Sequence, residues 1–295
     1  MQNLETWLKG IPYEVAFWNN VFRWKSTFQG MMGWSHYGEA IQLEQFDANA
    51  FLLQQPSPLV LDVGAGMSYA TGNHLQTADG LRPLDIHYVD PLAFHYNKIL
   101  RRHHRQLPPI DFGMMEHLSV FYPERNVSLV AIQNALDHSA SPMKGIWEAL
   151  AVLRQGGVLY LNHHPNEAET ERYKGFHQYN ITEEDGRLVI WNRAERICVD
   201  EQVQGMATVS TCRSAETGHV IAVLRKVGDV PPQHITDSAD RRKLCTVLLS
   251  QNQLQFSLRH TLSYHLTYWR FNVIQFFVQA LPWGVKMKLK HLLHR

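Results

Sequence analysis

The chain of 295 residues carries 28 Lys and Arg against 27 Asp and Glu, so its formal charge is +1. This length suits one catalytic domain with extensions, and the balanced charge argues against a protein that binds nucleic acid along its whole length. With 45% hydrophobic residues the chain is globular, which excludes extensive disorder. Its three cysteines are too few for a disulfide framework. We expect a cytoplasmic protein, since the sequence shows neither a signal peptide nor a run of about 18 apolar residues.

Residues 1–55 are rich in aromatic side chains and hold four of the eight tryptophans. The spacing of Val15, Trp18 and Phe22 is typical of one face of a helix. We expect a small helical cap here, either packed on the core or placed as a lid over a binding site.

Residues 56–227 alternate between short apolar runs and segments with helical periodicity. This alternation predicts a doubly wound α/β core around a mostly parallel sheet. Strands are expected at residues 59–63, 86–89, 127–133 and 158–161. Helices are expected from Pro91 to about residue 106 and from Pro142 to the Gly156–Gly157 pair. The β-segments 187–191, 205–212 and 219–226 follow one another without helices, which indicates an antiparallel edge.

Residues 228–240 form a polar linker that contains proline, and residues 241–295 form a basic extension. This extension has nine Lys and Arg, many aromatic residues, and neither Asp nor Glu. Such a segment is typical of an amphipathic helix that binds an anionic membrane surface. Helical packing on the core is the alternative, and nucleic acid is not an expected partner.

A glycine-rich turn, Gly64-Ala65-Gly66, follows the first predicted strand and the carboxylate of Asp62. A strand that runs into such a turn brings backbone N–H groups close to a ligand. The fingerprint of dinucleotide-binding proteins needs a glycine or alanine at the position of Tyr69, so the sequence argues against a dinucleotide site. A fixed negative charge beside the turn favours instead a ligand with a cationic amine or sulfonium.

The stretch from Asp62 to Gly66 resembles the first motif of class I S-adenosylmethionine-dependent methyltransferases. The resemblance implies that the loop passes under the methionine part of the cofactor and that Asp62 helps to hold its amine. Asp90, at the end of the second strand, would bind the ribose hydroxyls together with Pro91. Residues 67–83 depart from the family because they show no clear helix after the loop.

Further matches follow in order along the chain. Residues 112–118 lie where the family contacts adenine, so Met115 and Glu116 are implied cofactor residues. Asn134 begins Asn-Ala-Leu-Asp-His after the fourth strand, beside the transferring methyl group. Residues 154–159 are similar to the family's turn into its fifth strand. The resemblance covers about residues 56–227.

Methyl transfer to a hydroxyl needs a base near the acceptor, and His is the usual choice. His138 is the candidate base, oriented by Asp137 or Glu167, while His163 and His177 would bind the acceptor or share the proton. The alternative is a divalent metal held by Asp137, His138, His163 and His177. No HExxH or zinc-finger spacing supports it, so no metal is the favoured prediction.

The motif set also resembles a subgroup of bacterial methyltransferases associated with surface-polysaccharide genes. It implies an O-methyltransferase for a sugar hydroxyl of a glycan or glycolipid, at the inner face of the cell membrane if the basic extension binds lipid. A small-molecule methyltransferase, a non-catalytic docking protein with the same fold and an NAD-dependent oxidoreductase remain as alternatives.

Overall fold

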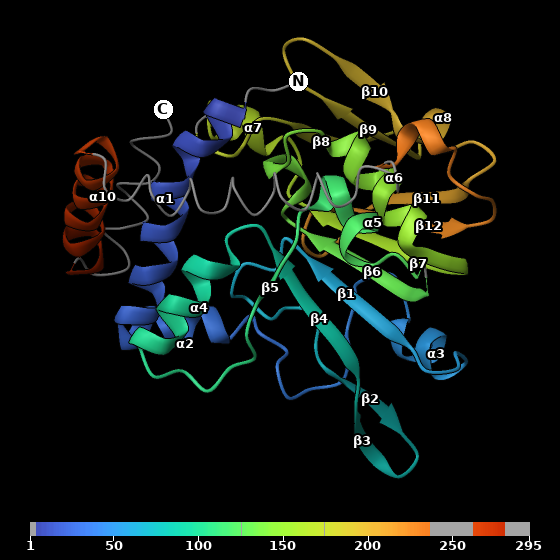
Figure 1. The fold of residues 1–295 in the computed structure, drawn as a ribbon, viewed down its shortest axis with the longest axis horizontal. Helices are drawn as coiled ribbons and strands as arrows, with labels where there is room; N and C mark the ends of the chain where they lie inside the picture. Colours follow the sequence, from blue (N-terminus) through green and yellow to red (C-terminus); the bar gives the residue numbers. More distant parts are fainter. Residues whose placement is uncertain (1–3, 125, 174, 237–261, 281–295) are drawn as a thin grey trace.

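A seven-stranded sheet forms the centre of the molecule in the computed structural model (Figure 1). The structure describes residues 4–124, 126–173, 175–236 and 262–280. The strand order is β11-β12-β7-β6-β1-β4-β5. The five strands β7, β6, β1, β4 and β5 are parallel, β12 is antiparallel to β7, and β11 is antiparallel to β12. The strands are β1 (Leu59–Val63), β4 (Asp85–Asp90), β5 (Asp111–Phe112), β6 (Val127–Gln133), β7 (Leu153–His163), β11 (Ala207–Arg213) and β12 (Val220–Lys226). The predicted doubly wound sheet with an antiparallel edge is confirmed.

The central strands are apolar on both sides because both faces of the sheet are covered. Val60 of β1 pairs with Ile86 on one side and with Leu129 on the other. Val60 and Leu129 are fully buried. One face packs against α6 (Pro142–Val152) and the short α5 (Leu118–Phe121), and the other against α3 (Ala48–Leu53).

A third apolar cluster lies beside the glycine turn and is built mainly by α1 (Leu4–Arg23) and α4 (Ala93–Arg102). Val15, Trp18 and Phe22 of α1 are buried, as their spacing predicts. Helix α2 (Lys25–Met32) continues α1, and the chain returns to this side with α10 (Leu262–Ala280), as Figure 1 shows. Asn20 of α1 donates a hydrogen bond to Asn272 of α10, with an N–O distance of 2.8 Å.

Most of the predicted basic extension, residues 241–261 and 281–295, lies outside the described residues. Its described part is the helix α10, on which Leu262, Leu266 and Trp269 are exposed. Within the ranges that the structure describes, no helix has the length and apolar character needed to cross a membrane.

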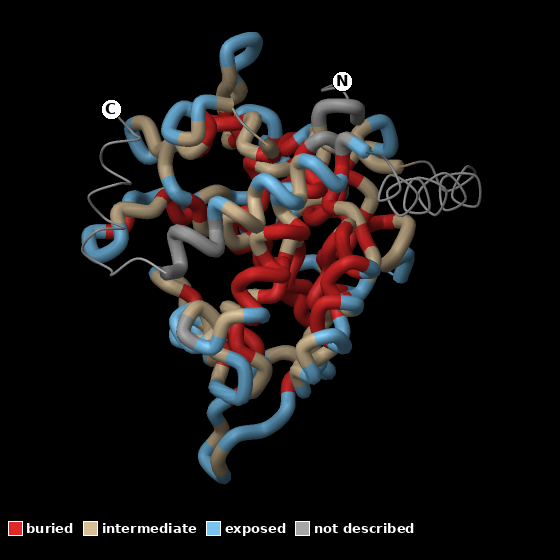
Figure 2. The backbone as a smooth tube through the Cα atoms, turned by 90° about the vertical axis from the view of Figure 1, so that its left-hand side faces the viewer, coloured by how far each residue is buried: buried red, intermediate tan, exposed pale blue. Residues whose placement is uncertain are grey.

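The connection from β1 to β4 holds an antiparallel hairpin, β2 (His74–Thr77) and β3 (Gly80–Pro83), instead of a helix. Figure 2 shows the exposed tip of this hairpin projecting from the buried centre. The lack of a helix over residues 67–83 was predicted, but the hairpin was not.

Three predicted helix boundaries are wrong, and one of them is the end of α4, which is Arg102 rather than about residue 106. Helix α4 begins at Ala93 rather than at Pro91, because Asp90 Oδ1 accepts a hydrogen bond from the Leu92 N–H and holds a turn there. Helix α6 ends at Val152, and β7 starts at once, so the Gly156–Gly157 pair lies within an irregular part of the strand.

The segment 187–191 belongs to a second sheet and not to the predicted edge of the first. This three-stranded antiparallel sheet consists of β8 (Asn180–Glu184), β9 (Arg187–Trp191) and β10 (Arg196–Cys198). The buried apolar residues of β8 and β9 belong to the same hydrophobic cluster as those of α6. The short helices are Met115–His117, Leu136–His138, α7 (Glu167–Thr170), α8 (Val199–Gln202) and Pro232–His234.

Candidate functional site

The glycine turn is a tight corner at the carboxyl end of β1. Gly64 and Gly66 both have left-handed backbone angles, with φ of +70° and +53°. A Cβ atom on Gly64 would lie 2.4 Å from the Cβ of Ala135, and one on Gly66 would lie 2.6 Å from the Trp18 ring. Glycine is required at both positions because of the backbone angle and because of the close neighbours.

A cavity of about 390 Å³ lies over the turn and over the carboxyl ends of the parallel strands. This is where ligands bind in open α/β sheets. Eight of the nine predicted cofactor residues line the cavity: Gly64, Ala65, Gly66, Asp90, Pro91, Met115, Glu116 and Asn134. The structure therefore brings together residues that lie up to 70 positions apart in the chain.

Asp90 is positioned by the backbone on both sides of it. Its Oδ2 accepts a hydrogen bond from the Gly66 N–H at 3.1 Å, and its Oδ1 accepts one from the Leu92 N–H at 2.7 Å. Burial raises the pKa of Asp90 to about 7, although these two bonds oppose the rise. The carboxyl group thus connects the glycine turn to the start of α4 at the edge of the cavity.

Asp62 is the one predicted cofactor residue that does not line the cavity. It lies beneath the turn, where its Oδ2 accepts a hydrogen bond of 2.6 Å from Thr71 Oγ1. The Gln133 side chain donates in turn to Thr71 Oγ1 at 3.0 Å. Burial raises the pKa of Asp62 to about 6. Its hydrogen bond therefore joins β1 to the loop that follows the turn.

The opposite wall of the cavity contains Glu116 and Asn134. Glu116 Oε1 accepts a hydrogen bond of 2.7 Å from the Ala140 N–H, and burial raises the pKa of this carboxyl group. Asn134 has a left-handed backbone angle, φ +50°, and its Oδ1 accepts a bond from the His164 N–H. Main-chain contacts therefore hold both side chains, that of Glu116 on the short helix Met115–His117 and that of Asn134 directly after β6.

Asp137, His138 and His177 form a compact cluster at one end of the cavity. His177 Nδ1 lies 2.8 Å from Asp137 Oδ2 and 3.1 Å from His138 Nε2, and His138 Nε2 lies 3.5 Å from Asp137 Oδ2. The two imidazoles line the cavity, while the Asp137 side chain is 3% exposed. Together the three side chains offer one ligand atom each to a metal ion.

The charges in this cluster depend on one another. Burial favours the neutral form of Asp137, but the His138 charge and the His177 hydrogen bond outweigh it and lower the pKa of Asp137. For His177 burial acts to lower the pKa, and the contact with Asp137 raises it overall. An ionised carboxylate thus faces two imidazoles.

His163, a predicted catalytic residue, lies outside the cavity lining. Its side chain is 1% exposed, and neither ring nitrogen has a hydrogen-bond partner among the described residues. Burial lowers its pKa to about 4, so it is a neutral buried side chain near Asp137. The predicted orienting carboxylate Glu167 is also near, and burial raises its pKa to about 7.

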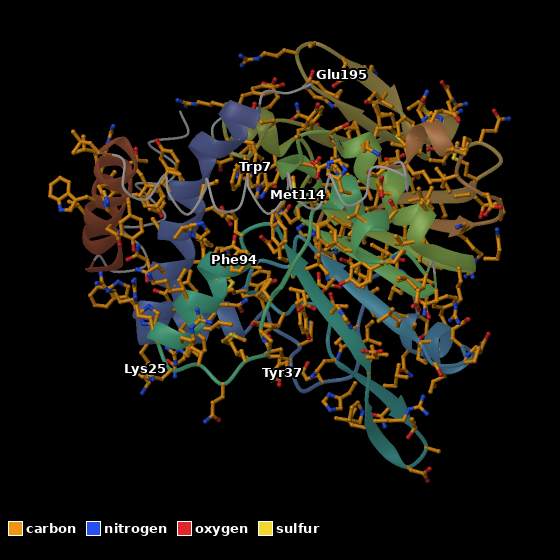
Figure 3. All side chains as sticks on the ribbon, in the orientation of Figure 1. Trp7, Lys25, Tyr37, Phe94, Met114 and Glu195 are labelled. Atoms are coloured by element: carbon orange, nitrogen blue, oxygen red, sulfur yellow. The ribbon has the colours of Figure 1, made fainter. Side chains whose placement is uncertain are left out.

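Helix α1 supplies a wall that the sequence interpretation did not assign to the cofactor. Trp7, Glu14 and Trp18 line the cavity, and the Trp18 Nε1–H donates to Glu14 Oε1 at 2.9 Å. Figure 3 labels Trp7 on this helix and Met114, another lining residue, beside the sheet. The three α1 residues are seven and four positions apart, so helical spacing was a usable signal for their common face.

A second, open cavity of about 770 Å³ adjoins the first. Ser68, Gln133 and Asn134 line both. Its other lining residues include the polar side chains of Gln42 and Asn162 and the exposed Trp34. It provides a place for a second molecule beside the first cavity.

Comparisons with known proteins add the following. No family model matches the sequence, and the search of curated proteins found no match. Among solved structures the chain is similar to a T. thermophilus 16S rRNA methyltransferase, RsmC, in complex with AdoMet and guanosine (14% identity, TM-score 0.34). That match covers 66% of this chain and 43%, less than half, of the other.

Two further matches are of similar strength. One is CalS10, an amino pentose methyltransferase from Micromonospora echinaspora (13% identity, TM-score 0.36, 59% of this chain and 85% of the other). The other is a possible histamine N-methyltransferase from Thermotoga maritima (15% identity, TM-score 0.35, 71% and 99%). The strand order and register described above establish the architecture. The chain has a Rossmann-like α/β fold with a mostly parallel sheet and an antiparallel edge.

Proposed function

We propose that the protein transfers a methyl group from S-adenosylmethionine to a hydroxyl oxygen. One observation carries this proposal: a single cavity joins the glycine turn and Asp90 to the cluster of Asp137, His138 and His177. The first group is suited to hold the cofactor, and the second to ionise an acceptor beside it.

The cavity suits a cationic cofactor. Its volume of about 390 Å³ is in the range of small-molecule sites. The carboxyl groups of Glu14, Asp90 and Glu116 line it and favour a ligand that carries a sulfonium and an amine. By the resemblance, Asp90 would bind the ribose and Glu116 would lie near the adenine.

A nicotinamide cofactor fits this loop less well. In proteins that bind nicotinamide dinucleotides, a helix begins directly after the glycine turn and binds the pyrophosphate at its N-terminus. Here residues 67–73 form turns, and Tyr69 is fully buried with its hydroxyl donating to the Pro108 carbonyl at 2.7 Å. The described loop therefore has no helix start to bind a pyrophosphate.

The transfer itself is an in-line displacement. The acceptor oxygen forms a bond to the methyl carbon, the carbon–sulfur bond breaks, and its electron pair stays on sulfur, which becomes a neutral thioether. The enzyme mainly aligns the reacting atoms. The acceptor O–H bond must also break, and the cluster can help either by direct proton transfer to His138 or by binding a divalent ion.

The second cavity supports an acceptor with several hydroxyl groups. Gln42 and Asn162 line it together with the exposed indole of Trp34. Amide groups pair with hydroxyl groups, and an indole face packs on the apolar side of a ring. A sugar hydroxyl, as the resemblance to the polysaccharide-associated subgroup implies, is the acceptor that we propose.

The test is calorimetric binding of S-adenosylmethionine and S-adenosylhomocysteine, with NAD for comparison. We expect micromolar binding of the first two and a loss of roughly 10–100-fold for Asp90→Asn, since a hydrogen bond to a charged group is worth about 1.5–3 kcal/mol. Asp85→Asn is the matched control, because Asp85 is exposed at the opposite end of the same strand.

Absence of binding by the folded protein would overturn the proposal, and binding of NAD alone would replace it with an oxidoreductase. If S-adenosylmethionine and S-adenosylhomocysteine bind as expected, a screen of sugar, small-molecule and nucleoside acceptors decides the substrate class.

A further inference from the structure

The contacts among Asp137, His138 and His177 are more crowded than hydrogen bonds alone explain. His177 Nδ1 is within 3.1 Å of both Asp137 Oδ2 and His138 Nε2. A ring nitrogen carries at most one hydrogen. If the hydrogen on His177 Nδ1 points to Asp137, it does not point to His138 Nε2. The gap between the two imidazole nitrogens then holds either no hydrogen or the hydrogen of His138 Nε2.

The three atoms are instead spaced like ligands of one ion. Their separations are 2.8, 3.1 and 3.5 Å. A triangle with these sides has a circumscribed radius of about 1.8 Å, so a point about 2.0–2.1 Å from all three atoms lies just outside its plane. That distance is the length of a zinc–nitrogen or zinc–carboxylate bond.

We infer that Asp137, His138 and His177 bind a divalent transition-metal ion of the zinc type. Two imidazoles and one carboxylate suit zinc and its neighbours, whereas magnesium prefers an all-oxygen shell. Three protein ligands leave a fourth position open, which is the arrangement of catalytic rather than structural zinc sites.

The surroundings agree with an ion that a substrate can reach. The imidazole side chains are 24% and 25% exposed and line the cavity, so the open position can face it. Asp137 Oδ1 is buried and has no hydrogen-bond partner among the described residues. Glu167, close enough to interact with Asp137 and His177, adds a second acidic group.

The chemical role of this ion rests on the proposed function. With an ion bound by these three residues, an acceptor hydroxyl at the open position would have a lowered pKa, and its proton would pass to a water molecule. The resulting oxygen attacks the methyl group as described above. The histidines would then act as ligands, in contrast to the metal-free site that the sequence favours.

His163 is not one of the ligands. It was part of the ligand set considered from the sequence, but the compact group of ligand atoms contains only the other three residues. Its fully buried ring places it behind the site.

The experiment is calorimetric titration of chelator-treated protein with Zn²⁺. We expect one equivalent to bind and the affinity to fall by about 100-fold or more in His177→Gln and in Asp137→Asn, since even outer-shell changes cost about 10–100-fold. His219→Gln is the control, because His219 belongs to another histidine pair, with His164, and bonds to the amide Asn162. Circular dichroism verifies that each variant is folded.

A second measurement needs no variant. Diethyl pyrocarbonate should modify His138 and His177 in the chelated wild-type protein, and Zn²⁺ should protect both, as peptide mass spectrometry would report. Substoichiometric binding, unchanged affinity in His177→Gln or equal modification with and without Zn²⁺ would each overturn the site.

Binding of S-adenosylhomocysteine is measured in the same samples. Cofactor binding without zinc binding would remove the metal site and leave the proposed function intact. Zinc binding without cofactor binding would keep the metal site and overturn the proposed function.

Discussion

Replacing Asp62 by Asn is expected to change how the stability of the protein depends on pH. Asp62 is 3% exposed, and burial raises its pKa from 3.8 to about 6. Because the folded protein then holds the Asp62 proton more tightly than the unfolded chain does, the contribution of Asp62 to the free energy of unfolding is greatest at low pH and falls as pH rises through this interval. At about 1.36 kcal/mol per unit, Asp62 accounts for a loss of about 3 kcal/mol.

About 2 kcal/mol of this loss should occur between about pH 4.5 and pH 8, with the remainder at lower pH. Urea denaturation of the wild type and Asp62→Asn at these two pH values measures it. The Asn side chain can still accept the Thr71 hydrogen bond, so the variant should gain about 2 kcal/mol over the wild type as pH rises. Asp79→Asn, at the exposed hairpin tip, should follow the wild type. Parallel curves for wild type and Asp62→Asn would refute the reasoning.

Two further variants test the packing around the site. Gly66→Ala should lower the free energy of unfolding by about 2–4 kcal/mol in thermal or urea denaturation, because Gly66 has a positive φ and its added Cβ would meet Trp18. The control Gly30→Ala should raise stability slightly, because Gly30 lies in a helix and its added Cβ meets no other atom. Lys144→Met should lower the free energy of unfolding by about 2–3 kcal/mol at neutral pH, because it removes the ammonium group 2.9 Å from the fully buried Glu148. Breaking a fully buried pair costs more, ~3–5 kcal/mol, and the Lys144 side chain is 28% exposed. That deficit should shrink in acid, where Glu148 becomes protonated; a deficit independent of pH would contradict this account.

The strands of the core could be predicted because each is a short apolar run of the kind that a sheet covered on both faces requires. Residues 59–63 and 127–133 are strands with those bounds. The hairpin at 74–83 was missed because its residues are mostly half-buried or exposed and carry little alternation of apolar and polar side chains. Helix starts were less certain, as the Asp90 side chain decides the start of α4 by a single hydrogen bond.

The candidate site was partly predictable for a similar reason. Residues at the carboxyl ends of parallel strands converge whatever their separation in sequence, so Asp90 and Asn134 could be placed together. His177 lies on a loop beyond the parallel strands, and its contact with His138 depends on the fold of that loop. Burial of His163 and the position of Asp62 beneath the turn depend on which way each side chain points, which a strand end does not determine from sequence alone.

Helix α1 forms the wall of the cavity over the glycine turn, but it is separate from the sheet that carries the reacting groups. It is held from outside by α4 and by α10, which come from distant parts of the chain. One side of the cavity is therefore formed by a helix near the N-terminus, and the other by residues at and after the strand ends. Under the proposed function, substitutions in α1 would alter how long a ligand stays bound, and substitutions after the strand ends would alter the rate of its conversion.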